Sequence, residues 1–305
     1  VVPGAFDAWM IMLRDYGTFD LETVLEPAIG YAQSGYPLVP AISTAIGQMQ
    51  ELFSSHWTSS GQIYLTHGVP KAGTLFCNTD LAKTYRRLVF DSKSAGGSRE
   101  HKIEAARNSW YRGFVAEAID KFCSTTKVLD TTGQHHTGLL CGDDLDRWQA
   151  TIEEPLTYDY HGYTLCKTKP WGQGPVALQH LALLNQFDLS QFKPEDPEFI
   201  HLLVETSKLA FADREAFYGD PNFVDVPIDT LLSSQYNANR KILIDSEASL
   251  LLRPGQVPGY EREAVTPSID AGSLETPGEG EPTVSSAIDV MTRGERRGDT
   301  CHLDV

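Results

Sequence analysis

The feature that most constrains this chain is a change in the spacing of its apolar residues. In the first 122 residues apolar side chains recur with helical periodicity, whereas residues 151–158 and 160–168 are rich in β-branched and aromatic residues. These two runs lie around Tyr160-His161-Gly162 and predict an antiparallel strand pair. The expected helices are, in chain order, residues 21–34, 39–56, 81–89, 100–122, 176–184, 198–217 and 236–243. Together the patterns predict an α+β fold, mainly helical with a few antiparallel strands.

Several expected helices carry recognisable start and stop signals. Asp20 and Asp80 have the side chain of an N-cap residue, and Asp196 precedes a long helix that Gly219 should end. Pro27 lies inside the first of these helices and should kink or restart it. Helical spacing places the following residues toward the core: Leu21, Val24, Leu25, Ala28, Ile29, Ala32, Leu81, Tyr85, Leu88, Val89, Ala105, Trp110, Phe114, Ile119, Phe122, Phe199, Leu202, Leu203, Ala210 and Phe217.

The charge of the chain limits its partners. Its formal net charge is −16, and 41% hydrophobic with 22% charged residues is the composition of a soluble globular protein. An acidic surface disfavours nucleic acid and anionic membranes as partners, because phosphate-rich polymers need Lys/Arg patches. The compact basic cluster Arg293, Arg296 and Arg297 is interpreted as a solvated loop. No apolar run reaches the roughly 18–20 residues of a membrane helix.

Cysteine and histidine spacing indicates neither a metal nor another cofactor. The five cysteines are widely separated and form no C-x-x-C pair, which argues against both a disulfide framework and a zinc site. His135-His136 has no neighbouring ligands at metal spacing, so a polar loop is the preferred interpretation.

A helix expected at residues 198–217 carries a charged set. Glu205 and Asp213 lie on roughly one face of it, and Arg214 neighbours Asp213. Paired carboxylates are able to do acid–base work, but a buried Asp–Arg–Glu network that holds the fold is the preferred interpretation.

The end of the chain carries the candidate nucleophile. A threonine hydroxyl is a poor nucleophile without an adjacent base. Cleavage between Asp299 and Thr300 would supply one, since the freed α-amine has a reference pKa of about 7.7–8.0 and can accept the hydroxyl proton. Strand alternation after Thr300 places Cys301 on the opposite face, toward a core. His302 lies on the other face from Cys301, where it can orient the site or serve structurally.

A series of short motifs runs in order along nearly the whole chain. They are Val2–Trp9 (VPGAFDAW), Tyr16-Gly17-Thr18, Leu25–Ile29 (LEPAI), Asp80-Leu81-Ala82, Tyr111-Arg112-Gly113 with Ala116, Gly142–Leu145 (GDDL), Glu205–Arg214 (ETSKLAFADR), Tyr218–Pro221 (YGDP) and Thr300-x-His302-x-x-Val305. This series resembles the large-subunit pattern of the γ-glutamyltranspeptidase family. The resemblance implies an N-terminal-nucleophile hydrolase with an αββα core, made as one precursor that cleaves itself before the threonine.

The resemblance also implies how the chain divides. Residues 1–251 correspond to a helical and α+β region of the large subunit, and the Gly-, Pro-, Ser- and Glu-rich stretch within 252–299 to a mobile connector. Residues 300–305 correspond to the first strand of the small subunit, the expected partner. The family's oxyanion donors would follow Val305 and its carboxylate-binding arginine would precede Val1, so we expect these 305 residues alone to be inactive.

Two departures from the family pattern bear on specificity. Where the family has a Pro-Pro-x-Ser-Ser-Gly-Gly run, this chain has Lys169–Pro175 (KPWGQGP), so Trp171, Gly172 and Gln173 are candidates to line the substrate pocket. The residue after Thr300 is a cysteine rather than a hydroxyl residue. The expected substrate is a γ-glutamyl amide of a glutathione-like donor, with transfer to water or an amino acceptor. A cephalosporin or glutaryl acylase-like amidase and a non-catalytic binding protein are the alternatives, and the compartment stays open between cytoplasm and periplasm or secretion.

Overall fold

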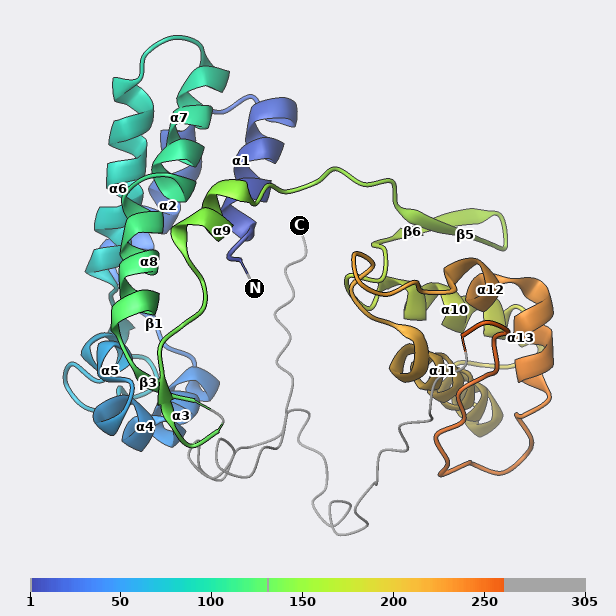
Figure 1. Ribbon diagram of the computed structural model, residues 1–305. Helices are drawn as coiled ribbons and strands as arrows, with labels where there is room; N and C mark the ends of the chain where they lie inside the picture. The colour runs from blue at the N-terminus through green and yellow to red at the C-terminus, as the bar shows by residue number, and fades with distance from the viewer. Residues whose placement is uncertain (1, 131, 261–305) are drawn as a thin grey trace. The chain divides into compact units, whose positions relative to one another are not determined.

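The computed structural model describes residues 2–130 and 132–260 (Figure 1). Within this range the chain folds as two compact units, the first ending at Thr151 and the second beginning at Ile152. Asp299, Thr300, Cys301, His302 and the basic cluster at 293–297 lie outside the described residues, as does the expected connector beyond Tyr260.

The described part of the first unit is mainly helical and also contains two very short antiparallel strand pairs. Helix α2 packs on α6, α6 on α7 and α7 on α1. Strand β1 pairs with β2 and β3 with β4, each pair antiparallel. The elements are α1 (Ala5–Tyr16), α2 (Leu21–Ser34), β1 (Tyr36–Pro37), α3 (Pro40–Gln48), α4 (Gln50–Ser55), α5 (Thr58–Tyr64), β2 (Leu75–Phe76), α6 (Thr79–Ser94), α7 (Arg99–Tyr111), α8 (Phe114–Thr125), β3 (Val128–Leu129), β4 (His135–His136) and α9 (Gly142–Arg147).

 The core of this unit includes Phe6, Met10, Leu21, Leu25, Leu88, Ile103, Ala106 and Leu145.

Helix starts in the first unit follow cap chemistry, with one correction. The Asp20 carboxylate accepts a hydrogen bond from the Thr23 N–H at 2.8 Å, which confirms the predicted cap of α2. The cap of α6 is Asn78, whose side chain accepts from the Leu81 N–H at 3.0 Å. The prediction of Asp80 was therefore wrong by two residues, and Asp80 lies in the first turn of α6.

Two expected long helices are each divided. The 39–56 helix ends at Met49, where α3 stops and α4 begins. The 100–122 helix is interrupted at Gly113, whose φ of −121° and ψ of −145° are not helical. A Cβ on Gly113 would lie 2.7 Å from the Ser109 carbonyl oxygen, so only glycine fits this break. Conversely, α2 continues through Pro27 as one helix, so of the two predicted outcomes, a kink or a restart, the restart is wrong.

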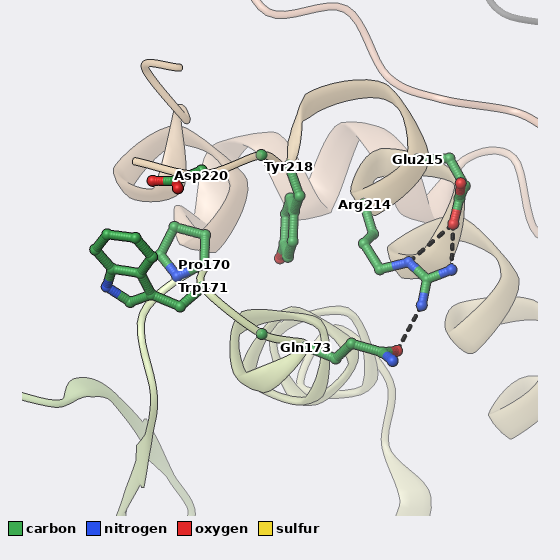
Figure 2. Close-up of a pocket in the computed structure, with 9 residues that line it drawn as sticks. Pro170, Trp171, Gln173, Arg214, Glu215, Tyr218 and Asp220 are labelled. Carbon is green, nitrogen blue, oxygen red and sulfur yellow. Dashed lines mark hydrogen bonds and ion pairs between the residues drawn. The ribbon is translucent and has the colours of Figure 1, made fainter. Parts of the chain in front are cut away.

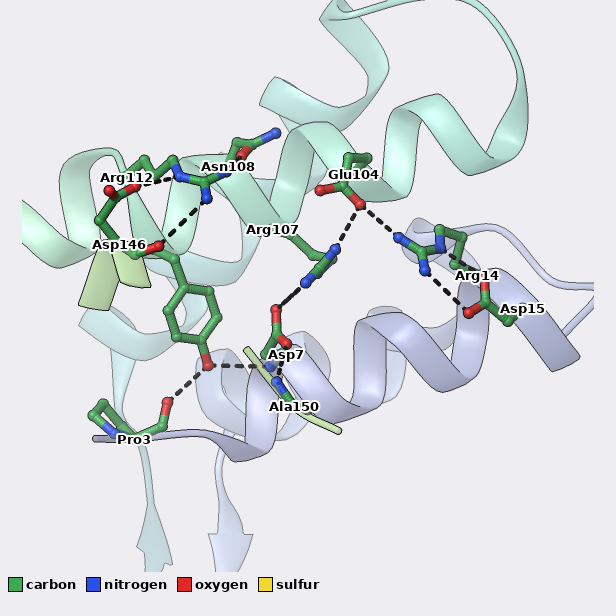
Figure 3. Close-up of polar contacts among 11 residues, drawn as sticks. Pro3, Asp7, Arg14, Asp15, Glu104, Arg107, Asn108, Arg112, Asp146 and Ala150 are labelled. Atoms are coloured by element: carbon green, nitrogen blue, oxygen red, sulfur yellow. Dashed lines mark hydrogen bonds and ion pairs between the residues drawn. The ribbon is translucent and has the colours of Figure 1, made fainter. Parts of the chain in front are cut away.

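A buried carboxylate fastens the last residues of the first unit to its first helix (Figure 3). Asp7 on α1 has a side chain only 2% exposed, and its Oδ1 lies 2.6 Å from Arg107 Nη2 on α7. Its Oδ2 accepts a hydrogen bond from the Ala150 N–H at 2.8 Å, although Ala150 is 143 residues away in sequence. Asp7 thus ties residues that follow α9 to the helical core.

The second unit contains one β-hairpin and a group of helices. Strand β5 (Leu156–Tyr160) pairs antiparallel with β6 (Tyr163–Lys167), which confirms the predicted strand pair in a shorter form. His161 and Gly162 join the strands with φ values of 49° and 84°, as a two-residue turn of the hairpin type requires. The helices are α10 (Gly174–Leu184), η1 (Leu189–Gln191), α11 (Pro197–Phe217), α12 (Ile228–Leu232) and α13 (Ser234–Lys241).

Helix α11 lies at the centre of this unit and packs on α10. Its fully buried positions include Leu209, Ala210 and Phe217, but also the polar residues Glu205 and Asp213. Phe199, Leu202 and Leu203 are only partly buried, so the predicted apolar stripe holds at its C-terminal half alone. In the first unit Val24, Leu81 and Phe122 are 43%, 38% and 44% exposed, and Ala28 is exposed as well, against the prediction that they face the core.

Two further observations concern the described part of the chain. None of the helices there is both long and apolar enough to cross a membrane. His135 and His136 form strand β4 rather than a loop, and His136 Nδ1 lies 2.7 Å from Asp130 Oδ2.

Candidate functional site

A pocket of about 480 Å³ opens in the second unit, between the loop before α10 and the C-terminal end of α11 (Figure 2). The loop contributes Trp171, Gly172 and Gln173, the three residues expected from the sequence to line a substrate pocket. The remaining lining residues are Pro170, Arg214, Glu215, Tyr218, Gly219 and Asp220.

Arg214 joins the two walls of this pocket. Its Nη1 donates to Gln173 Oε1 at 2.5 Å, and its guanidinium also forms an ion pair with Glu215. This connection holds the loop against α11 and leaves the Arg214 charge largely neutralised. Tyr218 lies deeper, and burial raises the pKa of its hydroxyl, which therefore remains protonated.

Asp213, the neighbour of Arg214, points into the interior instead. Its carboxylate is fully buried and accepts from Gln179 Nε2 at 2.6 Å, Tyr236 Oη at 3.0 Å and the Gly255 N–H at 2.6 Å; Arg240 Nη2 lies 3.3 Å away. Burial raises the pKa of the Asp213 carboxyl, while Arg240 and the neutral donors oppose that rise. The network joins α10, α11 and α13 to the chain beyond them.

Glu205, which precedes Asp213 on α11, is a second buried carboxylate. It pairs with Lys208 and with Arg253, whose Nη2 lies 2.7 Å from Glu205 Oε2, and it accepts from the Ser249 N–H at 3.3 Å. Burial alone would raise the pKa of Glu205, but its ion pairs prevail and hold that pKa below the usual value.

Both carboxylates hold residues 253–257, which we call the closing segment and which lie near the end of the described part of the second unit. Arg253 binds Glu205, Gly255 binds Asp213, and Val257 is buried with Phe217 and Tyr236. A Cβ on Gly255 would lie 1.9 Å from the Tyr236 hydroxyl oxygen, so this close approach requires glycine. The first residues of the expected connector are therefore packed on α11 and α13.

The contacts of Glu205, Asp213 and Arg214 differ from the single buried network that the sequence suggested. Glu205 and Asp213 are buried, but they share no partner, and Arg214 pairs with Glu215 rather than with Asp213. Their cationic partners include the buried Arg240 and the partly buried Arg253, which sequence reasoning missed. The sequence did carry one signal of the buried network: Gln179 is a polar residue inside the apolar run of α10.

Metal ligation and disulfides find no support in the described ranges. No group of three or more His, Cys, Asp or Glu side chains in residues 2–130 and 132–260 is arranged to hold a metal ion. Cys77, Cys123, Cys141 and Cys166 are free thiols.

The comparisons with known proteins agree with this architecture. The model of the gamma-glutamyltranspeptidase family matches residues 1–303. The glutathione hydrolase proenzyme of Bacillus subtilis (strain 168) is 33% identical over 246 residues, which are 80% of this chain and 38% of that relative. The fold is that of an α+β protein of the N-terminal-nucleophile hydrolase class, as predicted. The chain belongs to the gamma-glutamyltranspeptidase family.

Solved structures show the same fold. A threonine-to-alanine variant of LmbA2991 has a TM-score of 0.78 and 47% identity, with 84% of this chain and 43% of that chain covered. The cephalosporin acylase of Bacillus halodurans has a TM-score of 0.70 and 28% identity, with 84% of this chain and 44% of that chain covered. The chain spans about two fifths of the length of these relatives.

Proposed function

We propose that this chain is part of a self-processing γ-glutamyl amide hydrolase or transferase whose nucleophile is Thr300. The observation that carries the proposal is the family match, which extends to residue 303 and so includes Thr300 and His302. The B. subtilis relative is named a proenzyme, and a threonine was replaced in the LmbA2991 variant. Both facts support a threonine that acts in processing.

Processing would proceed by an N-to-O acyl shift. The Thr300 hydroxyl oxygen attacks the Asp299 carbonyl carbon, the peptide C–N bond breaks, and the Thr300 nitrogen takes up the proton. Water then hydrolyses the resulting ester, which frees the Asp299 carboxylate and regenerates the Thr300 hydroxyl. The new α-amine can now serve as the base for the same hydroxyl.

Turnover would use the same oxygen. The hydroxyl attacks the carbonyl carbon of a γ-glutamyl amide, the amine leaves with a proton, and the acyl-enzyme ester passes its acyl group to water or to an amino acceptor. Donors to the oxyanion, each contributing about 2.7–4 kcal/mol to the transition state, would come from the small subunit. The pocket lined by Trp171, Gly172 and Gln173 is the proposed substrate-lining surface of this chain.

The test uses the full-length precursor. Wild type should resolve into two polypeptides in denaturing electrophoresis, and Thr300→Ala should remain a single one. Thr300→Ser keeps both the hydroxyl and the α-amine and should still be cut, while Cys301→Ala should be cut as wild type is. A Thr300→Ala precursor that matures and hydrolyses amides normally would refute the proposal.

An acylase of the same fold is the second candidate, because the structural similarity includes a cephalosporin acylase. Release of p-nitroaniline from a γ-glutamyl anilide and from a glutaryl anilide separates the two. Faster turnover of the γ-glutamyl compound supports the first candidate, and the reverse order supports the acylase. A precursor that is never cut and turns over neither compound would instead indicate a non-catalytic binding protein.

A further inference from the structure

The pocket beside α11 presents an aromatic ring at its surface. The Trp171 side chain is 48% exposed, and its indole Nε1 donates to Glu153 Oε2 at 2.9 Å. This hydrogen bond fixes the edge of the ring and uses neither of its faces. About half of the residue is exposed, so part of the ring is accessible to a ligand.

A carboxylate without a cationic partner in the described residues lines the same pocket. Asp220 follows the C-terminal end of α11, and its Oδ1 accepts from the Asn222 N–H at 2.9 Å. Its Oδ2 has no hydrogen bond or ion pair among the residues that the structure describes. Figure 2 shows Trp171 and Asp220 at one end of the pocket and Arg214 at the other.

The other charges of the pocket cancel. Arg214 forms an ion pair with Glu215 and a hydrogen bond with Gln173, so its guanidinium is already engaged. The charge that remains among the lining residues is the negative charge of Asp220. An aromatic ring and an unpaired carboxylate that line the same end of a pocket favour a cation, because both the ring quadrupole and the carboxylate attract positive charge.

We propose that this end of the pocket binds a primary ammonium group, held between the Trp171 ring and the Asp220 carboxylate. The proposal rests on the function proposed above, in which the amino group of a γ-glutamyl donor and that of an amino acceptor both have this chemistry.

Calorimetric titration of the full-length protein tests the site without turnover. Glycinamide, which carries an ammonium group, should bind, and uncharged N-acetylglycinamide should not. Asp220→Asn and Trp171→Leu should each weaken glycinamide binding by up to about fivefold, the range of an exposed ion pair and of an exposed cation–π contact. Binding should also fall as the pH rises above about 8, where an α-amine loses its proton.

Asp188→Asn is the matched control. Asp188 is exposed and its Oδ1 accepts from the Ser190 N–H at 3.1 Å, the same local geometry as Asp220, but it does not line the pocket. Asp188→Asn should bind glycinamide as wild type does. Equal binding of the two probes, or equal affinity of Asp220→Asn and wild type, would overturn the proposal.

Steady-state kinetics identify the source of the ammonium group. With a γ-glutamyl anilide, Asp220→Asn should raise the KM of an added amino acceptor if the site holds the acceptor, and the KM of the donor in simple hydrolysis if it holds the donor. No change in either KM counts against the inference. A precursor that is never cut refutes the proposed function alone, since the calorimetric test does not depend on processing.

Discussion

Each unit uses a buried aspartate to hold a distant backbone segment against its helices, but the interactions of the two aspartates differ. In each, a buried aspartate accepts a hydrogen bond from a distant backbone N–H: Asp7 accepts from Ala150, and Asp213 from Gly255. Each bond spans many residues of sequence, 143 in the first case and 42 in the second. Residues after α9 in the first unit and the closing segment in the second are thereby fixed to the helices of each unit.

The partners of the two carboxylates differ. Asp7 faces Arg107, whose Nε and Nη2 lie 2.7 and 2.6 Å from the same oxygen, and Arg107 also pairs with Glu104. Asp213 instead receives short hydrogen bonds from neutral groups, while its cation Arg240 is 3.3 Å away. The first unit relies on a strong ion pair, and the second on the number of donors directed at one carboxylate.

Consecutive residues of α11 hold the closing segment and the pocket loop of the second unit. Asp213 and Arg214 are consecutive, and one holds Gly255 while the other holds Gln173 of the pocket loop. The interior network and the pocket wall therefore depend on the same turn of α11. No such arrangement accompanies Asp7 among the described contacts of the first unit.

The largest expected effect is the removal of each carboxylate. Asp213→Ala leaves Gln179, Tyr236, Arg240 and the Gly255 N–H without their shared acceptor and should lower the free energy of unfolding by about 3–5 kcal/mol. Asp7→Ala should cost about 1–3 kcal/mol, because Arg107 keeps Glu104 as a partner. Urea unfolding of the full-length protein measures both.

Hydrogen exchange gives the local control for this pair. The Gly255 amide should exchange faster in Asp213→Ala and the Ala150 amide faster in Asp7→Ala, each without change at the other site. The milder Asp213→Asn, which keeps one acceptor oxygen, covers the case in which Asp213→Ala does not fold. Equal costs for Asp7→Ala and Asp213→Ala would contradict the distinction between the two units.

The next effect concerns a glycine in each unit that lies against an aromatic ring. Gly255→Ala would place a Cβ 1.9 Å from the Tyr236 hydroxyl oxygen, and Gly4→Ala would place one 2.3 Å from Trp148 Cη2. Tyr236 is 8% exposed and bonded to Asp213, so it cannot move freely and the cost should be about 2–3 kcal/mol. Trp148 is less buried, and about 1 kcal/mol is expected.

Gly30→Ala is the control for these substitutions. Gly30 lies inside α2 with no atom within 4 Å of the added Cβ, so alanine should stabilise the protein by about 0.5–1 kcal/mol. Melting temperatures of the three variants give the order. A Gly255→Ala protein as stable as wild type would show that the closing segment is not tightly packed.

The sequence predicted the local structure of both units better than their long-range contacts. Asp20 was identified as a cap because the residue types and spacing of a cap are local. Asn78 and Asp80 both have cap chemistry, and only the non-helical backbone at Asn78, with φ −123° and ψ 81°, decides between them. The hairpin turn at His161-Gly162 was likewise visible in a short stretch of sequence.

The buried networks could not be predicted in the same way. Arg214 was the expected partner of Asp213, but consecutive residues on a helix do not face each other. The observed partners, Gln179, Tyr236, Arg240 and Gly255, come from separate parts of the chain and meet only through packing. The pocket residues Trp171, Gly172 and Gln173 were found through the family pattern, whereas Tyr218 and Asp220 on the opposite wall were identified as site residues only from the structure.

The smallest effect is a pH dependence that separates the two carboxylates of α11. The ion pairs hold the pKa of Glu205 below its usual value, so its charge stabilises the fold at neutral pH and this contribution is lost as the pH falls through that pKa. Glu205→Gln should therefore cost about 1–2 kcal/mol at pH 7 and less near pH 4. Burial raises the pKa of Asp213, so Asp213→Asn should show the opposite trend, with a cost that grows as the pH falls. Urea unfolding at pH 7 and pH 4 measures both slopes, and parallel slopes for the two variants would contradict the assignment of Asp213 as the more deeply desolvated group.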